Sequence, residues 1–375
     1  MLFTNARVFH DDNQFHDGTL AVSNGQFSEE SSTEPIDLEG RWVIPGLIDI
    51  HFHGNSGVDF SDGSYESLVK IARFLLNNGI TSFSPASMTL PEKDIEKSFL
   101  TAQRLKRERP AGAAYIRGIT MEGPFFNIAK KGAQNPRYLV PPDYDFFTRL
   151  NQAADGLIKI ACVAPELPGA LEFIEKAAAV CTVSVAHTTA TYDQAKAGFD
   201  AGIRHVTHLF NAMPPFAHRE PGVIGAAAEN KAVTAELITD GIHVHPSAIR
   251  AAFSLFGARR IVLVSDTMSA CGMPDGEYML GGQKVFVAGR LATLADGTIA
   301  GSATHLFDCL RTSLSCGIKP EDAIQAATAN PARVIGAFDQ VGSITTGKQA
   351  DFVVCNPDWS IHSVYLAGQR VLLNA

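Results

Sequence analysis

A short apolar run that ends in two histidines constrains this chain more than any other feature. The run covers residues 45–50 (PGLIDI), and His51, Phe52 and His53 follow it directly. Apolar runs of this length are typical of strands buried on both faces. Because side chains alternate along a strand, His51 and His53 point to the same face. Two such imidazoles can bind one metal ion or begin a two-metal site, whereas the simpler interpretation is that they cap a strand and meet water.

The sequence changes character along its length. Residues 1–46 contain short alternating pieces broken by polar turns such as Asn24-Gly25, which are typical of β-hairpin or sandwich structure. From residue 43 onward, strand-like runs alternate with amphipathic helices. The predicted strands end at residues 50, 84, 121, 163, 186, 207, 239 and 265, and helices are expected at 64–78, 91–109, 143–154, 168–179, 191–200, 222–230 and 246–256.

Eight strands that alternate with helices indicate a (β/α)8 barrel, although a doubly wound open sheet shows the same alternation. The polar residues favour the barrel, because barrel enzymes carry their chemistry just past the carboxyl ends of the strands. Six of the eight predicted strands are followed by such a residue, and these residues are His51 with His53, Glu122, His187, His208, His243 and Asp266. In a closed barrel these positions converge on one ring.

The segments after the eighth strand complete the expected architecture. Residues 271–297 are rich in Gly and Asp and predict a hairpin or lid, and helices are expected at 303–316 and 320–336. Residues 342–375 return to strand-and-turn character, which matches the N-terminal segment. We therefore expect an α/β protein in which residues 47–341 form a TIM-like metal-dependent hydrolase barrel. Residues 1–46 and 342–375 would together form a small β-sandwich domain.

Charge and cysteine content exclude several classes of partner. The net charge is −8 at pH 7, which gives no support for nucleic acid or a membrane surface as partner. The first residues lack a charged segment followed by a long apolar one, so no signal peptide is predicted, and no apolar run reaches spanning length. The six cysteines are scattered without a Cys-x-x-Cys pair. They are typical of reduced core residues, and we expect a cytoplasmic protein.

Histidines and a carboxylate at converging strand ends predict a divalent metal site, with zinc first and iron, manganese or cobalt as alternatives. A divalent ion lowers the pKa of its water from about 15.7 to about 7, so hydroxide is available near neutral pH. Asp266 is the candidate that takes a proton during attack and returns it to the leaving group. The predicted reaction is hydrolysis of an amide or a similar C–N bond.

These residues resemble the amidohydrolase superfamily, and within it the N-acetylglucosamine-6-phosphate deacetylase family. The resemblance covers nearly the whole chain, and the segment 207–213 (THLFNAM) is its most specific part. The other matching segments are 45–49 (PGLID), 122–125 (EGPF), 131–134 (KGAQ), 219–222 (REPG), 240–243 (DGIH), 265–266 (SD), 300–302 (AGS), 330–332 (NPA) and 347–351 (GKQAD).

The resemblance implies deacetylation of N-acetylglucosamine 6-phosphate to glucosamine 6-phosphate and acetate, in amino-sugar catabolism. It also implies a homodimer. The alternatives are N-acetylgalactosamine 6-phosphate as substrate, or a cyclic amide as in other amidohydrolases. Cys162 and Val163 occupy the end of the fourth strand, so no lysine is available there as a carboxylated bridge, which disfavours a cyclic amide. A non-catalytic sugar-phosphate sensor would be expected to lack Asp266 or a ligand, and none is missing.

The site residues that the resemblance implies fall into three groups. One or two ions would be bound by His51, His53, Glu122, His187 and His208, with Asp266 as general base and then acid. The sugar would be held by Ala133, Asn211, Ala212, Ile299, Ala300 and Gly301, and the phosphate end by Arg219 and His243, since a guanidinium suits phosphate. Gln134 stands where some members carry a histidine that polarises the acetyl carbonyl. Glutamine donates a hydrogen bond without charge, so a second ion would take more of that task.

Overall fold

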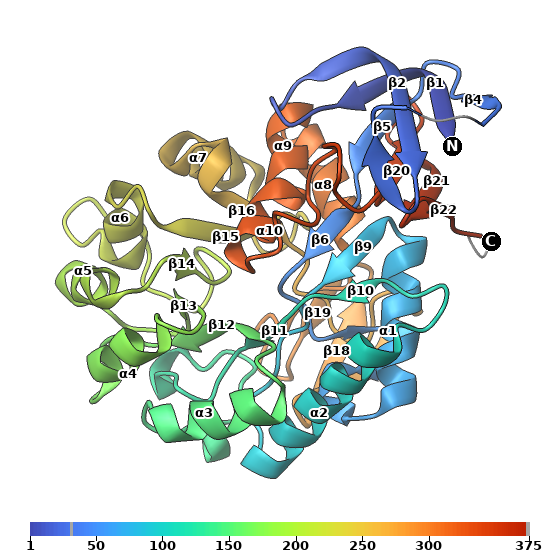
Figure 1. Ribbon diagram of the computed structural model, residues 1–375. Coiled ribbons are helices and arrows are strands. Elements are labelled where there is room, and N and C mark those ends of the chain that lie inside the picture. The colour runs from blue at the N-terminus through green and yellow to red at the C-terminus, as the bar shows by residue number, and fades with distance from the viewer. Residues whose placement is uncertain (31–32, 373–375) are drawn as a thin grey trace.

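The computed structural model describes residues 1–30 and 33–372 of the chain, and its centre consists of parallel strands (Figure 1). Six of these strands lie in the order β11-β12-β13-β14-β15-β16, and three more lie in the order β10-β9-β6. Their bounds are β6 Leu47–Asp49, β9 Ile80–Phe83, β10 Tyr115–Ile116, β11 Ile119–Met121, β12 Ile158–Val163, β13 Thr182–Val185, β14 His205–Val206, β15 Thr234–Ile238 and β16 Ile261–Val264. The chain thus has an α/β fold with a parallel-strand half-barrel.

Helices α2 to α7 lie around the outside of these strands (Figure 1). The helix bounds are α1 Tyr65–Asn77, α2 Glu92–Glu108, α3 Tyr144–Ala153, α4 Ala170–Ala177, α5 Tyr192–Ala201, α6 Gly222–Glu229, α7 Pro246–Phe256, α8 Leu306–Ser315, α9 Pro320–Ala327 and α10 Ala329–Val334. Local sequence fixes their ends. Ser64 accepts a hydrogen bond from the Ser67 N–H at the start of α1, and Thr191 with Gln194 forms a capping box on α5. The seven helices expected between residues 64 and 256 are confirmed within two residues at each end.

The single helix expected at 320–336 is wrong, because α9 and α10 are separated at Thr328. The backbone of Thr328 has φ −132° and ψ −77°, outside the helical region. Its hydroxyl donates to the Ile324 carbonyl at 2.7 Å. Pro331 lies in the first turn of α10, where its missing N–H leaves no helical bond unmade. This proline is the sequence signal for the break, because a proline suits a helix start better than its interior.

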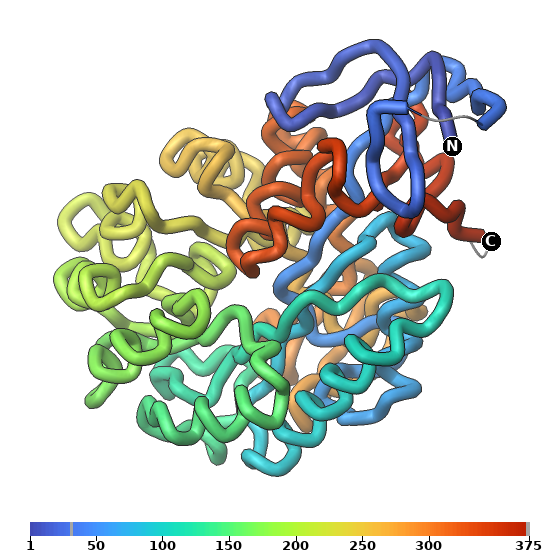
Figure 2. The backbone as a smooth tube through the Cα atoms, viewed as in Figure 1, coloured from blue at the N-terminus to red at the C-terminus, as the bar shows by residue number. Residues whose placement is uncertain are grey.

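Both ends of the chain contribute to one eight-stranded sheet. Its order is β22-β21-β20-β5-β1-β2-β3, and β4 pairs with β1. The bounds are β1 Leu2–Phe9, β2 Phe15–Ser23, β3 Gln26–Ser28, β4 Pro35–Asp37, β5 Trp42–Pro45, β20 Phe352–Cys355, β21 Ile361–Leu366 and β22 Gln369–Arg370. Asn24 and Gly25, both with positive φ, make the β2–β3 turn, so the predicted hairpin is confirmed. Figure 2 shows the N-terminal segment in blue and the described part of the C-terminal segment in red lying together in this sheet. Residues 373–375 of the predicted terminal domain lie outside the described residues, as do residues 31 and 32.

The chain passes directly from this sheet into the parallel strands at Gly46. A Cβ atom there would overlap the side chain of Thr81 on β9, so only glycine permits this approach. Leu47, Ile48 and Ile50 are fully buried, as the apolar run predicts. Ile48 and Ile50 belong to a core cluster with Ile160, Ile238 and Val262 from other parallel strands. The run that carries the two histidines is therefore held rigidly on both sides.

A small antiparallel sheet follows the last parallel strand, where a hairpin or lid is expected. It contains β17 Gly276–Leu280, β18 Gln283–Ala288 and β19 Leu291–Thr293. Leu280 and Val285 pack on Met88 and Met268 in a separate apolar cluster. The remaining short elements are β7 Gly54–Asn55, β8 Val58–Asp59 and the 3-10 turns Phe60–Asp62, Ile128–Lys130, Pro136–Tyr138 and Ala258–Arg260. Within 1–30 and 33–372, no helix is long and apolar enough to cross a bilayer.

Candidate active site

The residues predicted to bind metal, and Asp266 as the predicted proton carrier, follow the carboxyl ends of five parallel strands. His51 and His53 follow β6, Glu122 follows β11, His187 follows β13, His208 follows β14 and Asp266 follows β16, and all six side chains are buried. The backbone takes the left-handed conformation at His187, His208 and Asp266, with φ of 46°, 30° and 49°. Such conformations are uncommon outside glycine and cluster at functional sites. The sharp turn at each strand end aims the side chain across the top of the strands.

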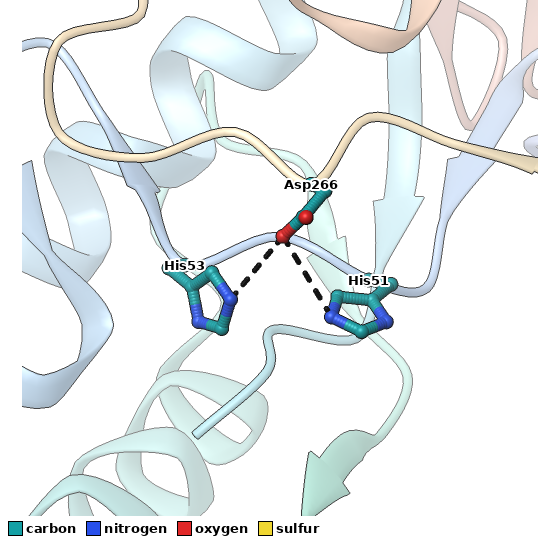
Figure 3. A group of neighbouring side chains, drawn as sticks. All are labelled: His51, His53 and Asp266. Atoms are coloured by element: carbon teal, nitrogen blue, oxygen red, sulfur yellow. Dashed lines mark ion pairs between the residues drawn. The ribbon is translucent and has the colours of Figure 1, made fainter. Parts of the chain in front are cut away.

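The first group of these side chains joins His51, His53 and Asp266 (Figure 3). Nε2 of His53 lies 3.3 Å from Oδ1 of Asp266, and Nε2 of His51 lies 3.8 Å from the same oxygen. Oε2 of Glu122 lies 3.3 Å from Nε2 of His53 and 3.5 Å from Nε2 of His51. Two imidazoles and two carboxylates thus surround one point.

The second group uses the other oxygen of Glu122. Oε1 lies 3.0 Å from Nε2 of His187 and 3.3 Å from Nε2 of His208. The two imidazole nitrogens lie 3.2 Å from one another. Glu122 therefore stands between the two groups and offers one oxygen to each.

This donor set fits divalent metal. Ligand atoms about 2.0–2.1 Å from a tetrahedral zinc ion lie about 3.3 Å from one another, close to the separations above. Nε2 of His51 and Oε2 of Glu122 are buried and have no hydrogen-bond partner among the described residues. Such atoms are costly when left unpaired. A metal ion would satisfy them, and it would also separate the facing nitrogens of His187 and His208.

The electrostatics of the site favour ionised carboxylates. Burial alone would raise the pKa of Glu122, but the charge of His51 and hydrogen bonds from His187 and His208 hold that pKa well below its usual range. Burial likewise opposes ionisation of Asp266, yet the hydrogen bond from His53 and the charges of His51 and His53 lower its pKa. A divalent cation would supply the same positive charge.

The outer ring nitrogens hold the imidazoles in place. Nδ1 of His187 donates to the Lys130 carbonyl at 2.8 Å, and Nδ1 of His53 lies 3.3 Å from the Ala86 carbonyl oxygen. Nδ1 of His51 lies 2.8 Å from the carboxylate of Glu236. Sequence analysis missed Glu236, although a single acidic residue inside the apolar strand 233–239 is a visible signal.

A cavity of about 550 Å³ opens onto these groups and collects most of the predicted substrate-binding residues. Of the residues predicted to bind metal, substrate or a proton, its lining includes His53, Glu122, Ala133, Gln134, His187, His208, Asn211, Ala212, His243, Asp266, Ile299 and Gly301. Lys130, Lys131, Asp296 and Thr298 also line it and were missed, because lysines and small polar residues in loops carry no distinctive pattern.

Three predicted site residues do not line this cavity. His51 and Ala300 are fully buried behind the lining. Arg219 is exposed in the segment between β14 and α6, outside the cavity.

Two polar residues that line the cavity are oriented by neighbouring atoms. Oε1 of Gln134 accepts a hydrogen bond from the Thr89 N–H at 2.7 Å, and its Nε2 lies 3.8 Å from the Met88 sulfur. Nδ1 of His243 lies 2.7 Å from the carboxylate of Asp240. Burial opposes protonation of His243, but the hydrogen bond and charge of Asp240 raise the pKa of the imidazole.

Comparisons with known proteins place this arrangement in a family. Residues 42–371 match the amidohydrolase family. The N-acetylglucosamine-6-phosphate deacetylase of Bacillus subtilis (strain 168) is 35% identical, with 96% of this chain and 94% of that protein covered. The N-acetylgalactosamine-6-phosphate deacetylase of Escherichia coli O157:H7 is 32% identical, with 97% of each chain covered.

Solved structures show the same similarity. The crystal structure of N-acetyl-D-glucosamine-6-phosphate deacetylase from Mycobacterium smegmatis has a TM-score of 0.92 at 31% identity, and covers 99% of this chain and 100% of that chain. A mutant of that protein, in complex with N-acetyl-D-glucosamine-6-phosphate, has a TM-score of 0.92 at 30% identity, with 99% of each chain covered. This chain is therefore an enzyme of the amidohydrolase family, and its close homologues are N-acetylglucosamine-6-phosphate deacetylases.

Proposed function

We propose that the protein hydrolyses N-acetylglucosamine 6-phosphate to glucosamine 6-phosphate and acetate, in amino-sugar catabolism. The observation that carries this proposal is the double donor set around Glu122, which opens onto the same cavity as Asp266 and the family's sugar-binding positions. The relatives named above are deacetylases of acetylated hexosamine phosphates, and their similarity to this chain covers nearly its whole length. N-acetylgalactosamine 6-phosphate is the second candidate, because one of these relatives bears that specificity in its name.

Asp266 is proposed as the residue that moves the proton. A bound divalent ion would polarise the acetyl carbonyl and acidify the attacking water. The Asp266 carboxylate accepts the proton of that water while the oxygen bonds to the acetyl carbon. It then gives the proton to the sugar nitrogen as the C–N bond breaks, so the free amine and acetic acid are formed, and the acid releases the second proton of the water to solvent as it leaves as acetate. Its ionised state at neutral pH, favoured by His51 and His53, suits the first of these two roles.

The metal content is proposed as two ions, of which zinc is the first candidate and iron, manganese or cobalt are alternatives. His51, His53 and Glu122 would hold one ion, and Glu122, His187 and His208 the other. The separate use of the two Glu122 oxygens supports this arrangement.

The remaining site residues are proposed to bind the substrate. Asn211, Ala212, Ala133 and the backbone of residues 299–301 would hold the sugar. Oε1 of Gln134 accepts from the Thr89 N–H, and one N–H of Nε2 faces the Met88 sulfur, so the second N–H of the amide would donate to the acetyl carbonyl. His243 and Arg219 would meet the phosphate, and the ammonium groups of the two cavity lysines add positive charge in an acidic protein.

We infer that the parallel strands, with β10 and β11 counted as one interrupted strand, form one closed eight-stranded barrel over residues 47–341. Backbone hydrogen bonds across both gaps between the two sheets support this inference. The Thr120 N–H donates to the Pro85 carbonyl at 2.9 Å, and the Asp266 N–H donates to the His51 carbonyl at 2.9 Å. Residues 1–46 and 342–375 are proposed as a small β-sandwich domain, since Phe3 and Phe352 pack in an apolar cluster made by residues of these two segments.

Two further properties of the molecule are proposed. A homodimer follows from the family resemblance. A reducing, cytoplasmic location is supported by six free cysteines, five of which are buried.

The decisive experiment measures acetate release from a panel of acetylated sugar phosphates, using enzyme whose metal content has been determined. We expect release from N-acetylglucosamine 6-phosphate, and much slower release from N-acetylglucosamine without phosphate. A higher kcat/KM for the galacto isomer would replace the first candidate by the second. No acetate from any acetylated hexosamine phosphate, with metal present, would contradict the proposal.

A further inference from the structure

We propose that Glu236 is a positioning residue that makes His51 a metal ligand, by holding its imidazole with Nε2 facing Glu122 and Asp266. Glu236 lies on β15, and only β16 stands between this strand and the segment after β6 that carries His51. Glu236 does not line the cavity. The inference deepens the proposed metal site and rests on it. It concerns the support of one ligand rather than the ligand set itself.

The contacts of Glu236 are specific to the carboxylate. Its Oε2 accepts from Nδ1 of His51 at 2.8 Å and from the backbone N–H of His208 at 3.0 Å. Its Oε1 lies 3.1 Å from Nε2 of His205. Three donors thus meet one carboxylate that is fully buried. The side chains of Glu236 and His205 are both fully buried, so water does not compete for these contacts.

The geometry fixes the tautomer of His51. A carboxylate oxygen only accepts, so the proton of the neutral imidazole stands on Nδ1 and the lone pair stands on Nε2. Nε2 is the buried atom that has no hydrogen-bond partner among the described residues. A hydrogen bond from the far ring nitrogen to a carboxylate both orients a ligating histidine and raises its basicity. Glu236 therefore supplies what a metal at Nε2 requires.

The carboxylate is itself held from behind. Nδ1 of His205 lies 2.6 Å from the hydroxyl of Thr234, so the His205 ring is fixed between Thr234 and Glu236. Because side chains alternate on a strand, Glu236 points inward with Ile238, while Ala235 and Leu237 pack in the outer core. A buried charge in such a strand is costly unless it is fully paired. Its three partners explain how the strand accommodates it.

The test compares the metal affinities of the wild-type enzyme, Glu236→Gln and His51→Asn. Glutamine keeps the size of the side chain, and His205 can reverse its tautomer to accept from the new amide, so the fold is expected to tolerate the change. Each ion's Kd is measured for zinc by competition with a chelator, and metal content is measured by mass spectrometry. We expect Glu236→Gln to raise the Kd of one ion by about 10- to 100-fold. The Kd of the other ion, on His187 and His208, should stay within about threefold of its wild-type value.

A double variant shows whether Glu236 acts through His51. If it does, His51→Asn/Glu236→Gln loses no more zinc affinity than His51→Asn alone. Asp351→Asn is the matched control, because Asp351 is also a buried carboxylate but lies in the terminal sheet and accepts from the Ala367 N–H. It should lower stability without changing either Kd.

Three results would overturn the inference. The first is a zinc affinity of Glu236→Gln equal to that of wild type. The second is a loss of zinc affinity in the double variant that equals the product of the two single losses. The third is a metal content of His51→Asn equal to that of wild type. If Glu236→Gln does not fold, 15N NMR of histidine-labelled, zinc-loaded wild type shows which ring nitrogen of His51 carries the proton. A His51 ring without a proton on Nδ1 would exclude the proposed contact with Glu236. Absence of acetate release by wild type would instead contradict the proposed function. The zinc affinities do not depend on acetate release, so the two failures can be told apart.

Discussion

Asp266 combines two properties that a proton carrier needs. Its carboxylate reaches the cavity, and its lowered pKa keeps it ionised at neutral pH. Asp266→Asn removes the basic oxygen but keeps the shape of the side chain. We expect kcat to fall by at least about 100-fold, since a removed acid–base group costs about two to four orders of magnitude. The measurement is acetate release at saturating substrate, with metal content and far-UV circular dichroism as controls, both of which should match wild type. A kcat near that of wild type would remove Asp266 from its assigned role.

Asp59 shows a different use of a buried carboxylate, as the cap of a 3-10 turn. It caps the turn at residues 60–62 by accepting from the Ser61 N–H, and its second oxygen has no partner among the described residues. Burial raises the pKa of Asp59 to about 6. The folded state therefore binds the proton more tightly than the unfolded chain does. The resulting stability is complete below about pH 3.9 and is lost as pH rises through 6.

Asp59→Asn should therefore stabilise the protein at high pH only. Asparagine keeps the capping oxygen and removes the unpaired charge. We expect the free energy of unfolding to rise by roughly 1–3 kcal/mol at pH 8 and by little at pH 4. Urea unfolding of metal-free protein at both pH values measures this difference. Asp145→Asn, at an exposed carboxylate in the first turn of α3, is the control. Equal effects of Asp59→Asn at both pH values would show that the charge is not the cause.

At the scale of elements, the loop after β15 carries His243, which is proposed to meet the phosphate of the substrate. Asp240 accepts from two backbone N–H groups of this loop and pairs with the His243 ring. The raised pKa of His243 means that its positive charge persists to higher pH and is lost as pH rises through that pKa. KM for the phosphorylated sugar should therefore increase at alkaline pH.

Asp240→Asn tests this link, because it removes the charge that holds the pKa of His243 up. The rise in KM should begin at lower pH in the variant than in wild type. The measurement is KM against pH for N-acetylglucosamine 6-phosphate, and the same series for the unphosphorylated sugar should show no such shift. Identical KM profiles for wild type and variant would separate His243 from phosphate binding.

The loop between β14 and α6 carries Arg219, which is exposed and does not line the cavity. Its proposed contact with the phosphate therefore needs a test. Arg219→Ala should raise KM for the phosphorylated sugar about tenfold to a hundredfold, as expected for a lost charge-assisted contact. KM for the unphosphorylated sugar should change little, and folding should be unaffected since the side chain is exposed. An equal change for both sugars would show that Arg219 does not contact the phosphate.

The arrangement of the elements also explains which parts of the fold and of the candidate site the sequence could predict. Strand ends were predictable because apolar runs of buried strands stop where a polar side chain must face the centre, as at His51, His187 and Asp266. Glu236 was missed because its partners, His51 and His205, lie on other strands, and such pairing is invisible in a linear pattern. The break at Thr328 was missed because the apolar pattern of α9 continues across it. The exposure of Arg219 depends on tertiary packing, which local pattern does not encode.

On the scale of the whole molecule, the proposed metal site connects the beginning of the parallel strands with their end. His51 follows β6 and Asp266 follows β16, and these two segments are 3.8 Å apart at their side chains. Ions held by His51 and His53 after β6, by Glu122 after β11 and by His187 and His208 after β13 and β14 would link segments that are far apart in the chain, as a cross-link does. Because ions bind the folded chain only, their removal should lower stability, by about 2.7 kcal/mol per ion when free metal stands at 100 times its Kd.

A metal titration of the metal-free enzyme tests both this stabilisation and the number of ions. Five candidate ligands exceed the three protein ligands of a single open zinc site, and Glu122 offers one oxygen to each group. We expect activity and melting temperature to rise together and to saturate at two equivalents per chain. His51→Gln/His53→Asn should saturate at one equivalent, with a lower melting temperature and reduced kcat. If wild type saturates at one equivalent, and the double variant keeps both metal content and kcat, the two-ion site is wrong. The deacetylase function would then rest on a single ion held by Glu122, His187 and His208.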